Sequence, residues 1–184
     1  MTPSPTPDDA QATLQRWLQA EEVARAAIEA GAGWGVSQRA AAIDGLSFMR
    51  GVLRGEYPAA PIARTLQFML VEVDPGRAVF QGTPQEDHYN PLGGVHGGWY
   101  ATLLDSALGC AVHTAMPAGR AYTTAELHLN LVRGLSTRVP RVRAEGRVIH
   151  AGRQLATAEA RLVGPDGTLY AHGSTTCLVF EPRG

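Results

Sequence analysis

One segment constrains the fold of this chain more than any other. The stretch Trp99–Thr114 is strongly apolar, contains few β-branched residues and is too long for a typical β-strand. We therefore expect it to form a buried helix. Because apolar side chains run nearly all round this helix, other elements of the fold must enclose it.

Strand-like segments lie on both sides of this helix in the sequence. Two precede it and are joined by an Asp-Pro-Gly turn, and four follow it. The expected strands are Thr65–Val73, Arg77–Thr83, Tyr122–Val132, Arg141–Ala151, Gln154–Val163 and Leu169–Phe180. The most economical arrangement is an α+β fold, with an antiparallel β-sheet wrapped around the long central helix.

The N-terminal part of the chain differs in composition from the rest and carries helical patterns in place of strand-like segments. Residues Met1–Asp9 are rich in proline and aspartate, and we expect a disordered tail there. Ala10–Ala30 and Asp44–Arg54 carry apolar residues at helical spacing. The sequence thus predicts an N-terminal tail and helical extension over residues 1–60 and the main domain over residues 61–184.

Composition excludes several classes of function. The chain has 16 basic and 17 acidic residues and a formal net charge of −1, which argues against a nucleic-acid partner and against a polybasic membrane patch. All the basic residues are arginine, so no mechanism can use a lysine nucleophile or base. The chain shows no signal peptide and no apolar run of the ~20 residues that cross a bilayer. We expect a cytoplasmic protein.

Thiol and metal chemistry are also disfavoured. Cys110 and His113 lie three residues apart on the expected helix, but Cys110 has small apolar neighbours and is best interpreted as a packed residue. His88 and His96 lie in one loop without an obvious third ligand, so we expect no metal site. Signatures such as G-x-S-x-G and the P-loop are missing.

A glycine-rich loop, His96-Gly97-Gly98, leads directly into the buried helix. The first N–H groups of a helix have no partner within it, and this end carries partial positive charge. Since glycine has no side chain, a ligand oxygen could approach these groups closely, as an oxyanion or a polarised carbonyl would require. The alternative is a plain tight loop before a helix.

Asp105 is the only acidic residue between Asp87 and Glu126, and it stands within the apolar helix. Such an acid is costly unless it has partners or a task. Its neighbours one turn away include Thr102 and Gly109, and Gly98 lies two turns away on the same side; these small or polar residues leave room for a ligand. The alternative is an aspartate at a solvent-facing gap.

Spacing along the helix separates the two candidate groups. Gly97 and Asp105 are eight residues apart, about 12 Å of helical rise, so they cannot readily act on one carbonyl from the same helix. A second copy of the helix, running antiparallel to the first, would bring Gly97 of one chain to Asp105 of the other. This predicts a two-fold dimer with two shared sites.

Three segments carry a family resemblance. They are N-P-L-G-G-V-H-G-G-W-Y-A-T-L-L-D-S-A-L-G-C-A from residue 90, T-T-A-E-L-H-L-N-L from residue 123 and H-A-G-R-Q-L-A-T-A-E-A from residue 150. Together they resemble the hotdog-fold acyl-CoA thioesterases of the phenylacetate-degradation (PaaI) type, over about Pro61–Phe180. The resemblance implies hydrolysis of an acyl-CoA without metal or organic cofactor, by dimers that often pair into tetramers.

By position, the resemblance also assigns roles. The Gly97 N–H polarises the thioester carbonyl with help from Asn90, and Asp105 of the partner chain acts as general base or nucleophile. Thr124 positions the water. His96, Gly98, Thr102 and Arg153 complete the expected substrate-binding set.

Coenzyme A phosphates require basic partners. The candidates are Arg133, Arg138, Arg141, Arg143 and Arg153, with Arg153 the first choice. The acyl group stays open between aromatic, short and medium-chain aliphatic. The alternative function is a hotdog module that binds acyl-CoA without catalysis, as a sensor or scaffold.

Overall fold

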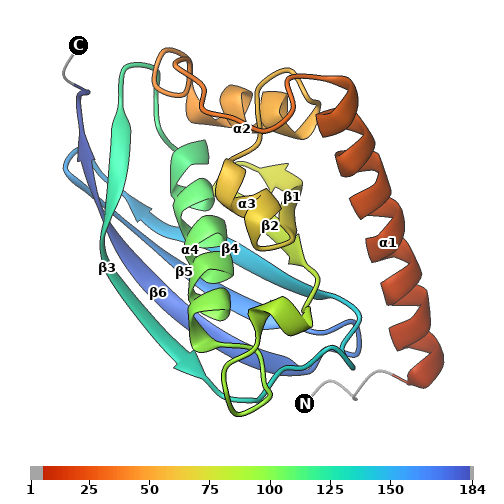
Figure 1. The fold of residues 1–184 in the computed structure, drawn as a ribbon. Coiled ribbons are helices and arrows are strands. Elements are labelled where there is room, and N and C mark those ends of the chain that lie inside the picture. Colours follow the sequence, from red (N-terminus) through yellow and green to blue (C-terminus); the bar gives the residue numbers. More distant parts are fainter. Residues whose placement is uncertain (1–5, 183–184) are drawn as a thin grey trace.

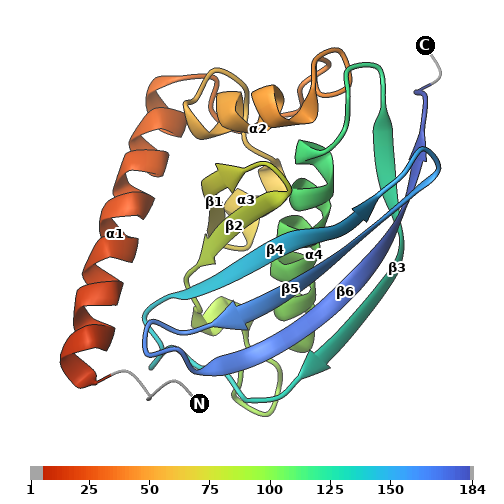
Figure 2. The same ribbon diagram turned by 180° about the vertical axis from the view of Figure 1, so that it is seen from behind.

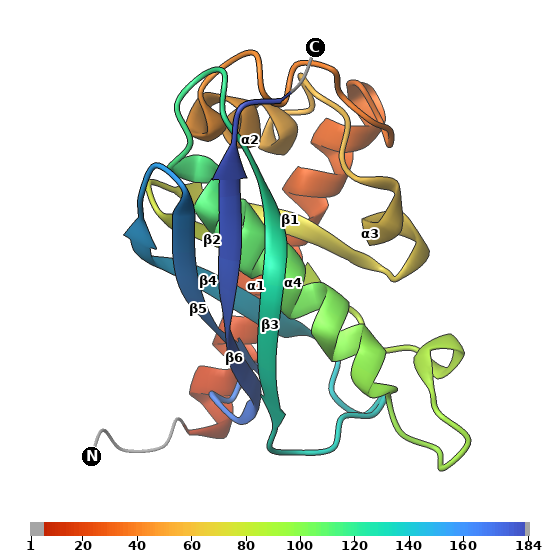
Figure 3. The same cartoon turned by 90° about the vertical axis from the view of Figure 1, so that its left-hand side faces the viewer.

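A computed structural model describes residues 6–182 of the chain. Its centre is one antiparallel β-sheet with the strand order β1-β2-β4-β5-β6-β3, wrapped around helix α4, Gly97–Thr114 (Figures 1 and 3). The strands are β1 Phe68–Asp74, β2 Arg77–Gly82, β3 Ala121–Leu131, β4 Val142–Ala151, β5 Leu155–Val163 and β6 Leu169–Phe180. The predicted α+β hotdog fold with an N-terminal helical extension is confirmed.

Helix α4 is the core of the fold. Leu103, Leu104 and Leu108 are completely buried against the concave face of the sheet. The sheet approaches most closely at Gly146, where a Cβ atom would lie 2.2 Å from the carbonyl oxygen of Ala107. A larger residue at 146 would push helix and sheet apart. The helix begins two residues earlier than predicted, because His96 caps its first turn.

The part of the chain before β1, called the N-terminal segment from here on, forms three helices within the described residues: α1 Pro7–Ala30, α2 Gly45–Leu53 and α3 Pro61–Thr65. The prediction of a tail through Asp9 is wrong for residues 7–9, because Thr6 and Asp9 form a capping box that starts α1 early. Residues 1–5 of that tail lie outside the described residues. The strand predicted from Thr65 starts later, at Phe68, because Pro61 begins the short helix α3.

Helix α1 runs along the outer side of β1 and β2, on the side away from α4 (Figure 2). The buried Glu21 carboxylate fastens it there, by accepting hydrogen bonds from Gln81 Nε2 at 2.8 Å and from Arg141 Nε at 2.5 Å. Arg143 stacks over the Trp17 ring at 4.8 Å. Buried charges this well paired fix a geometry, whatever their net contribution to stability.

Helix α2 lies near the C-terminal end of α4 and joins the main core (Figure 1). Phe48, Met49 and Val52 belong to the same buried cluster as Leu103 and Leu108. The amide of Gly45 donates to the carbonyl oxygen of Met116, just beyond α4, at 2.9 Å. Helix α2 therefore completes the main hydrophobic core together with α4 and the sheet. Within residues 6–182, no helix combines the length and apolar character needed to cross a membrane.

Candidate active site

Asp105 and Thr124 meet across the gap between α4 and β3. The Thr124 hydroxyl donates a hydrogen bond of 3.0 Å to Asp105 Oδ1. Both side chains are half-buried, so the second carboxylate oxygen can still reach a ligand or water. A carboxylate held by one hydroxyl and facing a cavity is suited to take a proton from water.

A β-bulge gives Thr124 its orientation. Strand β3 pairs Thr124 with Cys177 but Glu126 with Thr176, so one extra residue, Ala125, is inserted in β3. Tyr122 and Thr124 face α4 before the bulge, and Leu127 packs toward the core after it. Without the extra residue, the alternation of the leucines would turn Thr124 away from the helix.

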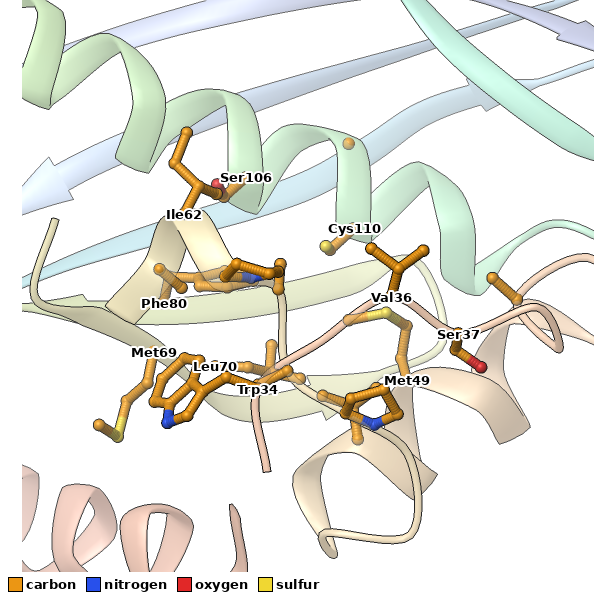
Figure 4. Close-up of a pocket in the computed structure, with 18 of the residues that line it drawn as sticks. Trp34, Val36, Ser37, Met49, Ile62, Met69, Leu70, Phe80, Ser106 and Cys110 are labelled. Atoms are coloured by element: carbon orange, nitrogen blue, oxygen red, sulfur yellow. The ribbon is translucent and has the colours of Figure 1, made fainter. Parts of the chain in front are cut away.

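Asp105 and Thr124 line an apolar cavity of about 430 Å³ beside α4, here called the Asp105 cavity. Figure 4 shows this cavity and the side chains around it. Helix α4 contributes Asp105, Ser106 and Cys110, and strands β1 and β2 contribute Leu70 and Phe80. The N-terminal segment supplies the opposite wall, with the large side chains Trp34, Phe48, Met49 and Val52. Among the described residues that line this cavity, Asp105 is the only one with a carboxylate, and none has a basic side chain.

The other titratable groups of this cavity are held neutral. Burial, and to a smaller extent the nearby Asp105 carboxylate, raises the pKa of the Cys110 thiol to about 12. Burial also raises the pKa of Tyr122 well above its ordinary value. Within residues 6–182, Cys110 forms no hydrogen bond with His113, whose pKa burial lowers. A neutral thiol is a poor nucleophile, which leaves Asp105 as the group able to accept a proton.

The glycine-rich loop presents one free donor. His96 is the N-cap of α4, and its Nδ1 atom accepts a hydrogen bond of 2.9 Å from the Gly98 N–H. The Gly98 N–H is therefore occupied within the loop. The Gly97 N–H, at the first position of the helix, has no acceptor among the described residues. It is the backbone group there that a ligand oxygen could use.

Asn90 organises the same loop. Its Oδ1 atom accepts hydrogen bonds from the N–H groups of Leu92 at 2.9 Å and Gly94 at 3.4 Å. This orientation leaves the side-chain NH₂ as a donor. Asn90 and Gly97 line a second, more polar cavity of about 300 Å³, the Gly97 cavity, together with Arg133. Neither Asp105 nor Thr124 lines it, so a single chain does not bring the two halves of the predicted site together.

The remaining predicted residues have separate places. The Thr102 hydroxyl donates to the carbonyl oxygen of Gly98 within α4, at 2.9 Å. Arg153 is exposed in the turn between β4 and β5, near Arg120. Arg141 pairs with Glu21, and Arg143 pairs with Glu72 at 2.5 Å. These two arginines are already committed to structural ion pairs, whereas Arg133 and Arg138 have no salt bridge among the described residues.

Sequence reasoning missed the wall that the N-terminal segment provides. The apolar face of α2 is visible as helical spacing, and Trp34 is a large apolar residue between helices. These signals indicate burial. They do not indicate that the burial partner is the cavity beside Asp105.

Comparison with known proteins shows which proteins this chain resembles. Residues 92–171 match the family model described as the thioesterase superfamily. This match is to the superfamily as a whole, and the resemblance to thioesterases of the PaaI type is confirmed by solved structures.

Solved structures agree with that class. A phenylacetic acid degradation-related protein from Ralstonia eutropha is 27% identical with a TM-score of 0.65, covering 71% of this chain and 98% of its own. A thioesterase family protein from Silicibacter pomeroyi is 26% identical with a TM-score of 0.61, and the match covers 66% of this chain and 90% of that protein. A mutant of the phenylacetic acid degradation protein PaaI from Thermus thermophilus is 28% identical with a TM-score of 0.58, and the match covers 64% of this chain and 97% of that protein. No curated protein sequence matches significantly.

Proposed function

We propose that the protein hydrolyses an acyl-CoA thioester to the free acid and coenzyme A. The observation that carries this proposal is the Asp105–Thr124 pair at the wall of an apolar cavity. The thioesterase-superfamily match over residues 92–171 supports it. A thioester carbonyl is electrophilic and a thiolate leaves readily, so one carboxylate and one or two oxyanion donors are sufficient.

The proposed reaction is a hydrolysis with Asp105 as the general base. Asp105 takes a proton from a water held by Thr124, and the resulting hydroxide attacks the thioester carbon. The Gly97 N–H and the Asn90 NH₂ of the partner chain stabilise the oxyanion of the tetrahedral intermediate. Collapse breaks the carbon–sulfur bond, and the departing thiolate takes a proton from Asp105 or from solvent. Asp105 could instead attack directly and form an anhydride, which water then hydrolyses.

The shared site requires a dimer, and two features support one. The Asp105 cavity contains the acid without the free N–H donor, and the Gly97 cavity contains the donor without the acid. Strand β3 is the last strand of the sheet, and its outer edge has no partner strand within residues 6–182. A long unpaired edge favours pairing with a second copy. The dimer would place α4 antiparallel to its copy, and a dimer of dimers is the larger assembly we expect.

A thioester panel tests the function. We expect the purified protein to release free thiol from at least one acyl-CoA. The total thiol released should equal the amount of thioester added. The alternative, a module that binds acyl-CoA without catalysis, predicts saturable binding by calorimetry with no thiol release. That result would overturn the proposed activity.

A further inference from the structure

We infer that residues 34–63 of the N-terminal segment form the acyl-binding wall of the site, and that the substrate carries a bulky apolar acyl group of six or more carbons. This inference rests on the proposed thioesterase function. It adds the substrate class and a specificity-determining segment that lies outside the match to the thioesterase-superfamily model.

The part of the Asp105 cavity that α4 forms carries polar groups, and the part that residues 34–63 form is apolar apart from Ser37 (Figure 4). Figure 4 shows Ser106 and Cys110 on the α4 side and Trp34 and Met49 opposite them. A thioester carbon placed for attack near Asp105 would therefore direct its acyl group away from α4. That direction leads to Met49 and its neighbours in the N-terminal segment.

The size of the cavity selects against small acyl groups. Its volume is about 430 Å³. An apolar cavity of roughly 150 Å³ is enough to hold a benzene molecule. An acetyl group would leave most of the apolar wall without contacts, whereas a longer acyl chain or an aryl group would bury it and gain affinity. We therefore place octanoyl among the good substrates and acetyl among the poor ones.

The wall is built into the fold. Trp34 forms a parallel bridge with Ala59, in which the Gly35 N–H donates to the Ala59 carbonyl oxygen at 2.9 Å. At Gly45 the chain packs so closely on α4 that a Cβ atom would lie 1.7 Å from the carbonyl oxygen of His113. Met49 is 5% exposed. Side chains held this firmly can discriminate between acyl groups by size.

Variants of Met49 test the inference. We expect wild-type kcat/KM for octanoyl-CoA to exceed that for acetyl-CoA by about tenfold or more, since each methylene contributes to discrimination in an apolar pocket. Met49→Trp should lower this ratio by filling the cavity, and Met49→Ala should move the optimum to longer chains. Met116→Ala is the matched control, because Met116 is equally buried but lies outside the Asp105 cavity. It should keep the wild-type ratio.

A binding experiment separates this inference from the proposed activity and does not depend on turnover. With Asp105→Asn, calorimetry should show tighter binding of octanoyl-CoA than of acetyl-CoA, and the added Met49→Ala change should alter that difference even if Met49→Trp fails to fold. Preferential binding without wild-type hydrolysis would keep the acyl site and remove the thioesterase. Hydrolysis with equal or greater preference for acetyl-CoA, or a ratio unmoved by both Met49 variants, would overturn the inference.

Discussion

The Asp105 cavity and the Gly97 cavity, which both touch α4, differ in polarity and in the chemical groups that line them. The Asp105 cavity is apolar, contains one acid and is walled partly by the N-terminal segment. The Gly97 cavity is smaller and polar, with a free backbone N–H, a side-chain amide and the guanidinium group of Arg133. One can activate water and receive an acyl group, and the other can stabilise an oxyanion. In the proposed reaction both cavities act on one thioester, and their separation on a single chain is the reason why that proposal requires two chains.

Loss of the acid should have the largest effect. We expect Asp105→Asn to lower turnover of the best acyl-CoA by about 100-fold or more, the scale of a general base, while the Thr124 hydrogen bond and the fold survive. Thiol release measures the turnover, and circular dichroism shows whether the fold survives. Asp166→Asn, in the turn between β5 and β6, is the control. A near wild-type rate for Asp105→Asn would remove that residue from the mechanism.

Mixed dimers test whether the two cavities cooperate across chains. An inactive Asp105→Ala chain is combined with an inactive Gly97→Val chain, so that one site of each mixed dimer carries both lesions and the other carries neither. Up to half of the wild-type activity per mixed dimer should return. A Cβ at Gly97 meets only the end of the flexible Leu131 side chain, at 3.0 Å, so the variant chain should fold. Purified mixed dimers without activity, or an active monomer, would contradict the shared site.

Asn90 provides a sharper test of the Gly97 cavity. Asn90→Asp keeps an acceptor for the Leu92 N–H but removes the NH₂ donor, whereas Asn90→Ala removes both. We expect both variants to lower kcat by about tenfold or more with little change in KM, because the donor acts as charge develops on oxygen. Steady-state kinetics on the best substrate measures this. A rise in KM alone would assign Asn90 to substrate binding.

Thr124 should show the smallest effect. Thr124→Val keeps the shape of the side chain but loses a hydrogen bond to the carboxylate, a contribution of about 1.5 kcal/mol or roughly a tenfold change in rate. Thr124→Ser should retain most of the activity, since it keeps the hydroxyl. Equal losses in both variants would indicate that the methyl group, and thus packing against α4, is what matters.

Local patterns in the sequence determine most of the elements. The apolar stretch around Leu104 predicts α4, and the turns at residues 74–76 and 164–167 locate the strand ends, because hydrophobic periodicity and turn chemistry act over a few residues. The isolated position of Asp105 in that stretch marks it as a functional candidate. Two helix starts, at Pro7 and Pro61, differ from the boundaries predicted from the sequence. They depend on helix capping and on proline at the first helical position.

Only the tertiary structure decides which of these residues meet. The bulge at Ala125 aims Thr124 at Asp105, and strand pairing between distant segments creates that bulge. Arg141 and Arg143 form ion pairs with Glu21 and Glu72, which lie far away in the sequence, so these two arginines are already paired. The cavity wall around Met49 also depends on contacts between distant parts of the chain. Apolar periodicity shows that one face of a helix is buried, but it does not show which residues cover that face. Such choices depend on long-range packing, which no short window of sequence contains.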